Sequence, residues 1–548
     1  MKTISNNKVL AWSIIVAAIG ITVSSSSICE AAARNLVPDQ PGTSPNYWCT
    51  WAAQNYVYGQ GFEEIDPAEV EGWKGAEKAR SNINEQLLFD PAKGWLNTFY
   101  SKCREDLYIV LDDGWDVPLD GPAAWYSSFL LNEGKFPGYA KLSPGQRLIK
   151  LNKAAKDAGW RGIGLWLAAQ ESSGARGDLT DEEYWLERIK WCKDAGIEYW
   201  KVDWGHKSSD NKFRKFLTDL AAKEYPELVV EHAVSHDPFN EIPRIDAGWV
   251  DQIVHQASFS GVVRLYDLSP QLSVPAMLDR VAWALKTAEN NTSSTATLNC
   301  DDEPYLAAAA GICMGVLRHP MTGLRPDPDP DLFFNGPRFQ KKRTDEVARC
   351  ARWHRIAPAF PVGSCKVELD DNLLTDSWKF ESGDFWAGIG QTINQNAPAR
   401  VSRGLPLADV KAEGQLPYVV ASKNPNGAVS IATLGRMSHK TGWSEPKADV
   451  SLSVGEIPHA IGVFGVYKSL TLEFDTPIAP QHIWAQDIAG DKAVDIYNDL
   501  KIAGNKITLS GELIEKIGLS AATKGDVSGP GLVIVMEAGK KAKDRAAK

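Results

Sequence analysis

The sequence has little of what metal-binding or nucleic-acid-binding proteins need. Its 8 Cys are scattered over 548 residues, and no pair has the CxxC spacing that is typical of structural zinc sites. Basic residues are outnumbered by acidic ones, which gives a formal net charge of -10. Because phosphates would on average be repelled, a nucleic acid or an anionic membrane is a poor partner. We expect neither a resident metal nor a cofactor.

Long apolar runs are also rare. The clearest one, Val9–Val23, follows Lys2 and Lys8 and precedes Ala31-Ala-Ala33, which fits the cleavage site of a secretory signal. The run is shorter than the roughly 20 residues that a membrane helix needs. We therefore expect a signal peptide over 1–33, no membrane span, and a secreted or periplasmic protein.

The length of 548 residues predicts two domains, because one core of that size is unusual. Strand-like and helix-like segments alternate between residues 46 and 360. Near Pro358 the pattern changes to short alternating segments separated by Gly, Pro, Asn and Asp. We expect a catalytic (β/α)8 barrel over 34–360, an antiparallel β-sandwich over 361–538 and a disordered tail over 539–548. No low-complexity linker separates the domains, which predicts that they pack together.

Eight short apolar segments are predicted to be the barrel strands. They are Asn46–Trp51, Leu107–Asp112, Gly162–Ala168, Tyr199–Asp203, Leu228–His232, Val262–Asp267, Ala296–Cys300 and Met314–His319. The amphipathic stretches between them include Gln146–Ala158, Glu182–Ala195, Lys212–Lys223 and Pro275–Ala288.

Three of these predicted strands end in an acid, at Asp112, Asp203 and Asp267. In a barrel the carboxyl ends of all strands open onto one face, so these acids would converge. Glycoside hydrolysis needs two carboxyl groups across an oxocarbenium-like transition state. Lys201 lies on the same strand face as Asp203 and would favour an ionised nucleophile there. The spacing of Arg264 and Asp267 does not fix how their side chains are oriented.

Tryptophan is abundant, with 20 residues, of which 12 lie between Trp48 and Trp204. Indole faces stack well on the C–H faces of sugars, but they are also ordinary packing material. Composition alone leaves both interpretations open.

The motifs resemble those of a known group. Asp112-Asp-Gly-Trp, Lys201-Val-Asp203 and the Arg264…Asp267 segment look like the signatures of α-galactosidases of glycoside hydrolase family 27 and their clan D relatives in family 36. Trp48-x-x-Trp51 resembles the Trp pair on the first strand of these enzymes. The sequence departs from many members at Gly114 and Gly205, where they carry Cys.

The resemblance implies a secreted, exo-acting, retaining α-glycosidase, most closely an α-galactosidase, that acts on an oligosaccharide or polysaccharide. Asp203 would be the nucleophile and Asp267 the acid/base. The implied sugar contacts are Asp112 and Asp113 to O4 and O6, Lys201 and Arg264 to neighbouring hydroxyls, Glu231 near O2, and Trp51 and Trp166 as aromatic lining.

Alternatives stay open at the level of sequence. A related clan D enzyme could act on a β-L-arabinopyranoside or an α-N-acetylgalactosaminide. A metal-dependent barrel lyase or isomerase would use Asp112, Asp113, Glu231 and Asp301 as magnesium ligands. A carbohydrate-binding protein without catalysis is a third class. Asp301 and Asp302 are also read as caps of a helix that opens at Pro304. The sequence is compatible with a homo-oligomer and does not fix the oligomeric state.

Overall fold

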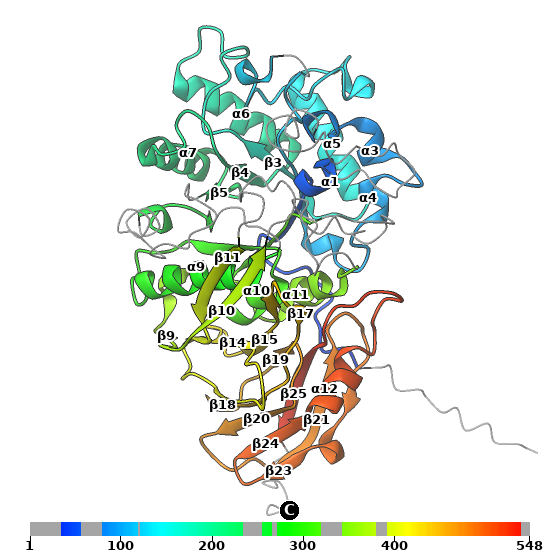
Figure 1. Cartoon of the computed structure of the whole chain (residues 1–548). Helices are drawn as coiled ribbons and strands as arrows, with labels where there is room; N and C mark the ends of the chain where they lie inside the picture. The colour runs from blue at the N-terminus through cyan, green and yellow to red at the C-terminus, as the bar shows by residue number, and fades with distance from the viewer. Residues whose placement is uncertain are drawn as a thin grey trace, which may run out of the picture. The chain divides into compact units, whose positions relative to one another are not determined.

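The N-terminal part of the chain is a closed barrel of eight strands, in which each strand pairs in parallel with its neighbours (Figure 1). The computed structural model describes residues 34–55, 79–118, 121–233, 255–265, 271–318, 342–379 and 392–538. The barrel strands are β1 (Tyr47–Cys49), β2 (Tyr108–Leu111), β3 (Gly162–Leu167), β4 (Tyr199–Val202), β5 (Val229–Ala233), β6 (Val262–Arg264), β7 (Thr297–Asp301) and β8 (Cys313–Val316). Each falls within or overlaps a predicted strand, so the predicted (β/α)8 fold is confirmed.

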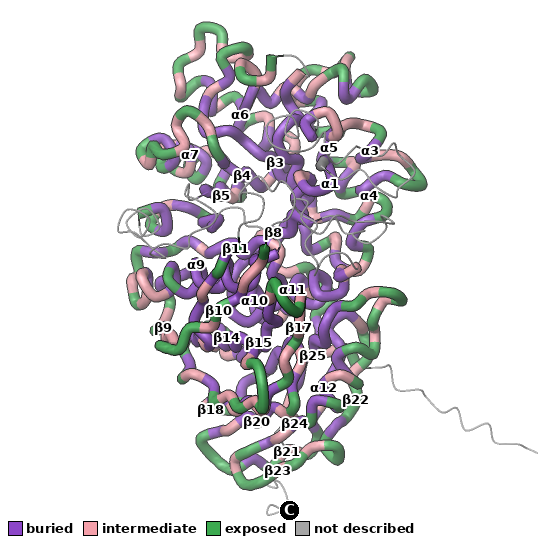
Figure 2. Tube along the Cα trace, in the orientation of Figure 1, coloured by how far each residue is buried: buried purple, intermediate pink, exposed green. Residues whose placement is uncertain are grey.

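Side chains of the barrel strands alternate between two environments. Trp48, Leu165 and Val230 point outward and belong to the large core between strands and helices. Tyr47 and Tyr199 point inward and belong to a separate cluster inside the barrel. The alternation has period two, as the pleat of a strand requires. Figure 2 shows the labelled barrel strands coloured mostly as buried, and every residue of β2, β3 and β4 is buried. This burial explains why their sequences read as apolar runs.

The helices that cover the barrel are α5 (Pro144–Asp157), α6 (Asp181–Ala195), α7 (Asn211–Glu224), α9 (Ser273–Ala288), α10 (Pro304–Ala310) and α11 (Asp345–Ile356), with the shorter α1 (Trp51–Asn55), α3 (Glu85–Phe89) and α4 (Trp95–Thr98). Four of them, α5, α6, α7 and α9, begin and end within two residues of the predicted amphipathic stretches. Helix α6 begins with a capping box of Thr180 and Glu183 and ends at Gly196 in the left-handed conformation.

The C-terminal part contains two sheets that pack face to face. The larger sheet has the order β22-β21-β25-β19-β15-β14-β12-β9 and the smaller one β13-β18-β20-β24-β23. Val419 and Ile431 of the larger sheet share one core with Leu452 and Leu472 of the smaller, as in a β-sandwich. The expected all-antiparallel pairing is wrong in detail, because β12–β14, β15–β19 and β18–β20 pair in parallel.

The bounds of the C-terminal elements are as follows: β9 (Val367–Leu369), β10 (Leu373–Lys379), β11 (Thr392–Pro398), β12 (Arg400–Arg403), β13 (Asp409–Lys411), β14 (Tyr418–Lys423), β15 (Val429–Leu434), β16 (Arg436–Ser438), β17 (Gly442–Ser444), β18 (Asp449–Gly455), β19 (Ile461–Phe464), β20 (Ser469–Phe474), β21 (Pro480–Asp487), β22 (Val494–Asp495), β23 (Lys501–Ala503), β24 (Lys506–Ser510), α12 (Gly511–Gly518) and β25 (Gly531–Ala538).

Buried polar contacts join the barrel to the sandwich. Arg349 of α11 binds Asp487 of β21 through two contacts, of 2.9 and 3.0 Å. Arg403 of β12 donates to the carbonyl of Ala310, the last residue of α10, at 2.7 Å. The two parts therefore pack against each other without a linker, as predicted.

The predicted signal peptide over 1–33, the predicted tail over 539–548 and Asp267 all lie outside the described residues. Within the residues that the structure describes, no helix has the length and apolar character that a membrane crossing requires.

Candidate active site

Asp203 follows directly after β4 at the carboxyl end of the barrel, and its side chain is held from two sides. Its Oδ1 lies 2.7 Å from Nη2 of Arg264, in an ion pair rather than an aligned hydrogen bond. Its Oδ2 accepts a hydrogen bond of 3.0 Å from Nε1 of Trp166. Arg214 donates to the Asp203 carbonyl at 2.9 Å and so fixes the backbone where the strand ends. Only 5% of Asp203 is exposed.

These partners keep the Asp203 carboxyl ionised. Burial raises its pKa, but the charges of Arg264 and Lys201 and the hydrogen bond from Trp166 outweigh burial, so the pKa lies below its usual value. An ionised carboxylate at the end of a barrel strand can act as a nucleophile.

Lys201, two residues earlier on β4, has a different direct partner. Its ammonium lies 2.7 Å from Oδ2 of Asp112, at the end of β2. The same oxygen accepts a hydrogen bond of 2.8 Å from the thiol of Cys49 on β1. Lys201 is thus the counter-ion of Asp112, whereas Arg264 is the direct counter-ion of Asp203.

Asp113 lies next to this pair and is held by Arg80. Oδ2 of Asp113 accepts a hydrogen bond of 3.0 Å from Nε of Arg80, whereas Oδ1 has no hydrogen-bond partner among the described residues. Burial raises the pKa of Asp113 to about 7, although the Arg80 charge opposes this shift. A buried carboxyl oxygen without a partner is costly unless something else binds it.

Glu231 on β5 lies deeper in the barrel. It has no exposed surface. Its carboxyl accepts hydrogen bonds from Tyr199 at 2.7 Å, Asn299 at 2.8 Å and Tyr47 at 3.3 Å. Arg264 contacts Glu231 at 3.5 Å. Burial raises the pKa of Glu231 above its usual value. Glu231 therefore supports the residues above it and does not present an oxygen to a ligand in this structure.

Arg264 is the last residue of β6, and its guanidinium forms ion pairs with three acids inside the barrel. Besides Asp203 and Glu231 it contacts Oδ2 of Asp301, on β7, at 3.7 Å. Its side chain has no exposed surface, so the sugar contact that the resemblance implies would have to be indirect. Arg264 therefore points into the barrel, and its orientation relative to Asp267 stays open because Asp267 lies outside the described residues.

Aromatic rings border the acids on one side. Trp166 of β3 packs on Trp204 at 5.5 Å between ring centroids, and Trp204 packs edge-on to Tyr126 at 5.0 Å. Trp51, the first residue of α1, is half-buried and packs on the same inner cluster. Such rings and carboxylates together are suited to binding a sugar, which has both C–H faces and hydroxyl groups.

Two glycines explain why this chain departs from the Cys-containing pattern. Gly114 and Gly205 have φ of 113° and 147°. A Cβ at Gly114 would lie 2.7 Å from the backbone of Arg80, and one at Gly205 would lie 2.6 Å from the backbone of Ala169. A cysteine therefore fits neither position without a backbone shift. All seven Cys of the described residues are free thiols.

The structure brings together eight of the nine predicted site residues, and the ninth, Asp267, lies outside the described residues. Tyr47, Tyr199, Cys49 and Asn299 were not predicted. For Tyr199 a signal was available, because it lies two residues before Lys201 and period two places both on the inner face.

The reading of Asp301 and Asp302 as helix caps is wrong. No side chain caps the start of α10. Asp301 contacts Arg264, and Asp302 accepts hydrogen bonds from the backbone N–H groups of Leu317 and Arg318. The chain turns at Asp302, where φ is 56°, before the helix begins.

The acids do not form a metal centre. Asp112 is bound by Lys201, and Glu231 by two tyrosines, Asn299 and Arg264. In the part of the chain that the structure describes, no group of three or more His, Cys, Asp or Glu side chains is arranged to hold a metal ion. The described acids are thus paired with cations and hydrogen-bond donors of the chain itself.

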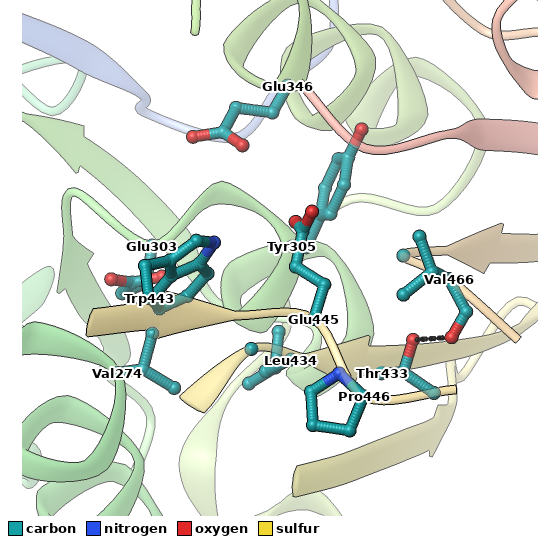
Figure 3. Close-up of a pocket in the computed structure, with 12 residues that line it drawn as sticks. Val274, Glu303, Tyr305, Glu346, Thr433, Leu434, Trp443, Glu445, Pro446 and Val466 are labelled. Carbon is teal, nitrogen blue, oxygen red and sulfur yellow. Dashed lines mark hydrogen bonds between the residues drawn. The ribbon is translucent and has the colours of Figure 1, made fainter. Parts of the chain in front are cut away.

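A second cavity, shown in Figure 3, is lined by Glu303, Tyr305, Glu346, Trp443 and Glu445 among others. Its volume is about 20 Å3, which is room for about one water molecule. Arg318 neutralises Glu346 at 2.6 Å. This cavity is too small for a sugar, and none of the barrel acids described above lines it.

No family model and no curated protein match the chain. Among solved structures it is similar to a family 27 β-L-arabinopyranosidase from Geobacillus stearothermophilus, with 10% identity, a TM-score of 0.39 and coverage of 91% of this chain and 97% of that one. It is also similar to an α-amylase from Geobacillus thermoleovorans, with 9% identity, a TM-score of 0.40 and coverage of 92% and 100%. A third similar structure is the carboxyl transferase domain of Rhizobium etli pyruvate carboxylase, with 12% identity and a TM-score of 0.28. The match covers 57% of this chain and 47% of the pyruvate carboxylase chain. A family 27 enzyme is thus among the similar structures. At these identities and TM-scores the likenesses assign neither a family nor an activity, which rest on the chemistry of the site.

Proposed function

We propose that this protein is a retaining glycoside hydrolase with Asp203 as its nucleophile. The observation that carries the proposal is the pairing of Asp203 with both Arg264 and Trp166, which keeps the carboxylate ionised while 5% of the residue stays exposed. An ionised carboxylate held by two contacts is suited to attack an anomeric carbon and form a covalent glycosyl-enzyme.

The second carboxyl group is proposed to be Asp267, which follows Arg264 by three residues in sequence. It would protonate the leaving-group oxygen and then activate the water that releases the sugar. The balance of atoms is that of a double displacement, in which the glycosidic bond breaks as the bond to Asp203 forms and water later replaces Asp203.

The sugar is proposed to be a terminal α-galactosyl residue of an oligosaccharide or polysaccharide, outside the cell or in the periplasm. Asp112 and Asp113 support this choice. They lie side by side at the end of β2, and one oxygen of Asp113 is left without a partner among the described residues. An acidic pair of this kind accepts hydrogen bonds from two neighbouring hydroxyls, such as O4 and O6 of galactose.

Trapping the intermediate tests the mechanism. A slowly hydrolysed fluorinated galactoside should label Asp203, and mass spectrometry of the digested protein should find the adduct on the peptide that contains it. Asp203→Asn should abolish both labelling and turnover while it leaves the fold intact. Asp219→Asn, at an exposed carboxyl on α7, is the matched control and should keep full activity. Labelling elsewhere, or normal turnover by Asp203→Asn, would reject the nucleophile assignment.

A panel of nitrophenyl α- and β-glycosides tests the sugar. Fastest turnover of the α-galactoside would support the proposal. Preference for a β-L-arabinopyranoside or an α-N-acetylgalactosaminide would keep the mechanism and replace the substrate.

A further inference from the structure

Trp204 is the most exposed member of the aromatic group beside Asp203. It follows Asp203 directly in sequence, and 37% of it is exposed, compared with 1% of Trp166 and 5% of Tyr126. The rings thus run from the interior, where Trp166 donates to Asp203, to the surface at Trp204.

The Trp204 ring is held in place although it is exposed. Trp166 and Tyr126 contact it from two directions, with interplanar angles of 59° and 79°. The Trp204 carbonyl accepts a hydrogen bond of 2.7 Å from the N–H of Ala169. Gly205, at φ 147°, lies against the same backbone segment. A rigid exposed ring binds a ligand with little loss of conformational entropy.

The depth of the neighbouring groups indicates which part of a ligand reaches Trp204. Asp112, Asp113 and Lys201 are each at most 4% exposed, so the ring that they hold lies deepest. In a site that binds the terminal sugar of an oligosaccharide at its deepest point, the second sugar of that oligosaccharide lies nearer the protein surface. Trp204 occupies that outer level, one residue from the nucleophile.

We infer that Trp204 is a stacking platform for the second sugar, the one on the leaving-group side of the cleaved bond. This inference rests on the proposed function and deepens it, because it assigns the natural substrate to glycosides whose leaving group is itself a sugar. The flat indole face would pack against the C–H face of that pyranose ring and so stabilise the bound oligosaccharide.

The test compares two substrates that differ in the second ring. One is an α-galactosyl disaccharide, and the other is α-galactosyl fluoride, which has the same first ring and no second sugar. Trp204→Ala should lower kcat/KM for the disaccharide, mainly through KM, by roughly 10-fold or more beyond any loss that it causes on the fluoride. Trp204→Phe should restore much of the disaccharide activity, because a flat ring remains.

The matched control is Trp283→Ala on α9, where a Trp of similar exposure, 36%, lies on a helix outside the barrel strands. It should not change the ratio of the two activities. Equal losses on both substrates for Trp204→Ala would overturn the inference, since they would mean that Trp204 acts through Trp166 and Asp203. Absence of turnover of both substrates by the wild-type protein would instead reject the proposed α-galactosidase activity.

Discussion

Replacement of Arg264 by Met should shift the pH dependence of the proposed glycosidase activity and lower the stability of the protein. Arg264 and Asp203 lie 2.7 Å apart and are almost completely shielded from solvent. Two unit charges at this distance attract by about 6 kcal/mol at an effective dielectric constant of about 20. Desolvation cancels part of that attraction. Truncation of one partner of a buried pair typically costs about 3–5 kcal/mol, because the other charge stays buried without its counter-ion.

The direction of the pH effect follows from the pKa of Asp203, which lies below its usual value because Arg264 and Lys201 outweigh burial. A depressed pKa contributes stability that is present above the unfolded pKa, about 3.9, and is lost as the pH falls through the folded pKa. Without Arg264 burial dominates, so the pKa of Asp203 should rise. The acidic limb of the profile of kcat/KM against pH should move to higher pH, since Asp203 must be ionised to attack.

The assay is the pH profile of kcat/KM on an aryl α-galactoside, together with thermal unfolding at neutral pH. Arg264→Lys is the control, since it keeps the charge and should keep the acidic limb near its wild-type position. A contact with substrate hydroxyls predicts a different result, namely a higher KM at every pH with the acidic limb unchanged. That result, or unaltered thermal stability of Arg264→Met, would refute the assignment of Arg264 as the residue that positions and ionises Asp203.

Two further predictions concern the sugar contact and the domain interface. Asp113→Asn should weaken hydrolysis of α-galactosides far more than that of arabinopyranosides, which lack the O6 group, and equal losses in kcat/KM on both would contradict the O6 contact. Arg349→Met should destabilise the protein by about 3–5 kcal/mol through loss of its buried pair with Asp487, and calorimetry should show a lower unfolding temperature. In the double variant Arg349→Met/Asp487→Leu much of that loss should be recovered, because no uncompensated charge remains buried; a double variant as unstable as the single one would argue against the charge as the cause.

The barrel was predictable because its signal is local. A strand that is buried on both faces reads as a short apolar run, and a helix between two such runs begins with a capping residue and ends with Gly, as α6 does between Thr180 and Gly196. The convergence of Asp112 and Asp203 also followed from sequence, because the carboxyl ends of all parallel strands in a barrel lie on one face. The mixed pairing of the sandwich did not follow, because alternation within one strand carries no information on the direction of its neighbour.

Sequence by itself therefore determined which residues stand at the open end of the barrel and which of them point inward. Only the tertiary structure decided which of these charged side chains form ion pairs with one another. Lys201 was expected to favour the ionised form of Asp203, its neighbour on β4, and its charge does help to lower the pKa of that carboxyl. Its direct ion pair, however, is with Asp112 of the β2 end, and the direct partner of Asp203 is Arg264 of β6. The physical reason is that charges separated by two strand widths meet inside a closed barrel through long side chains. Their pairing depends on the register and closure of all the strands, which no single segment encodes.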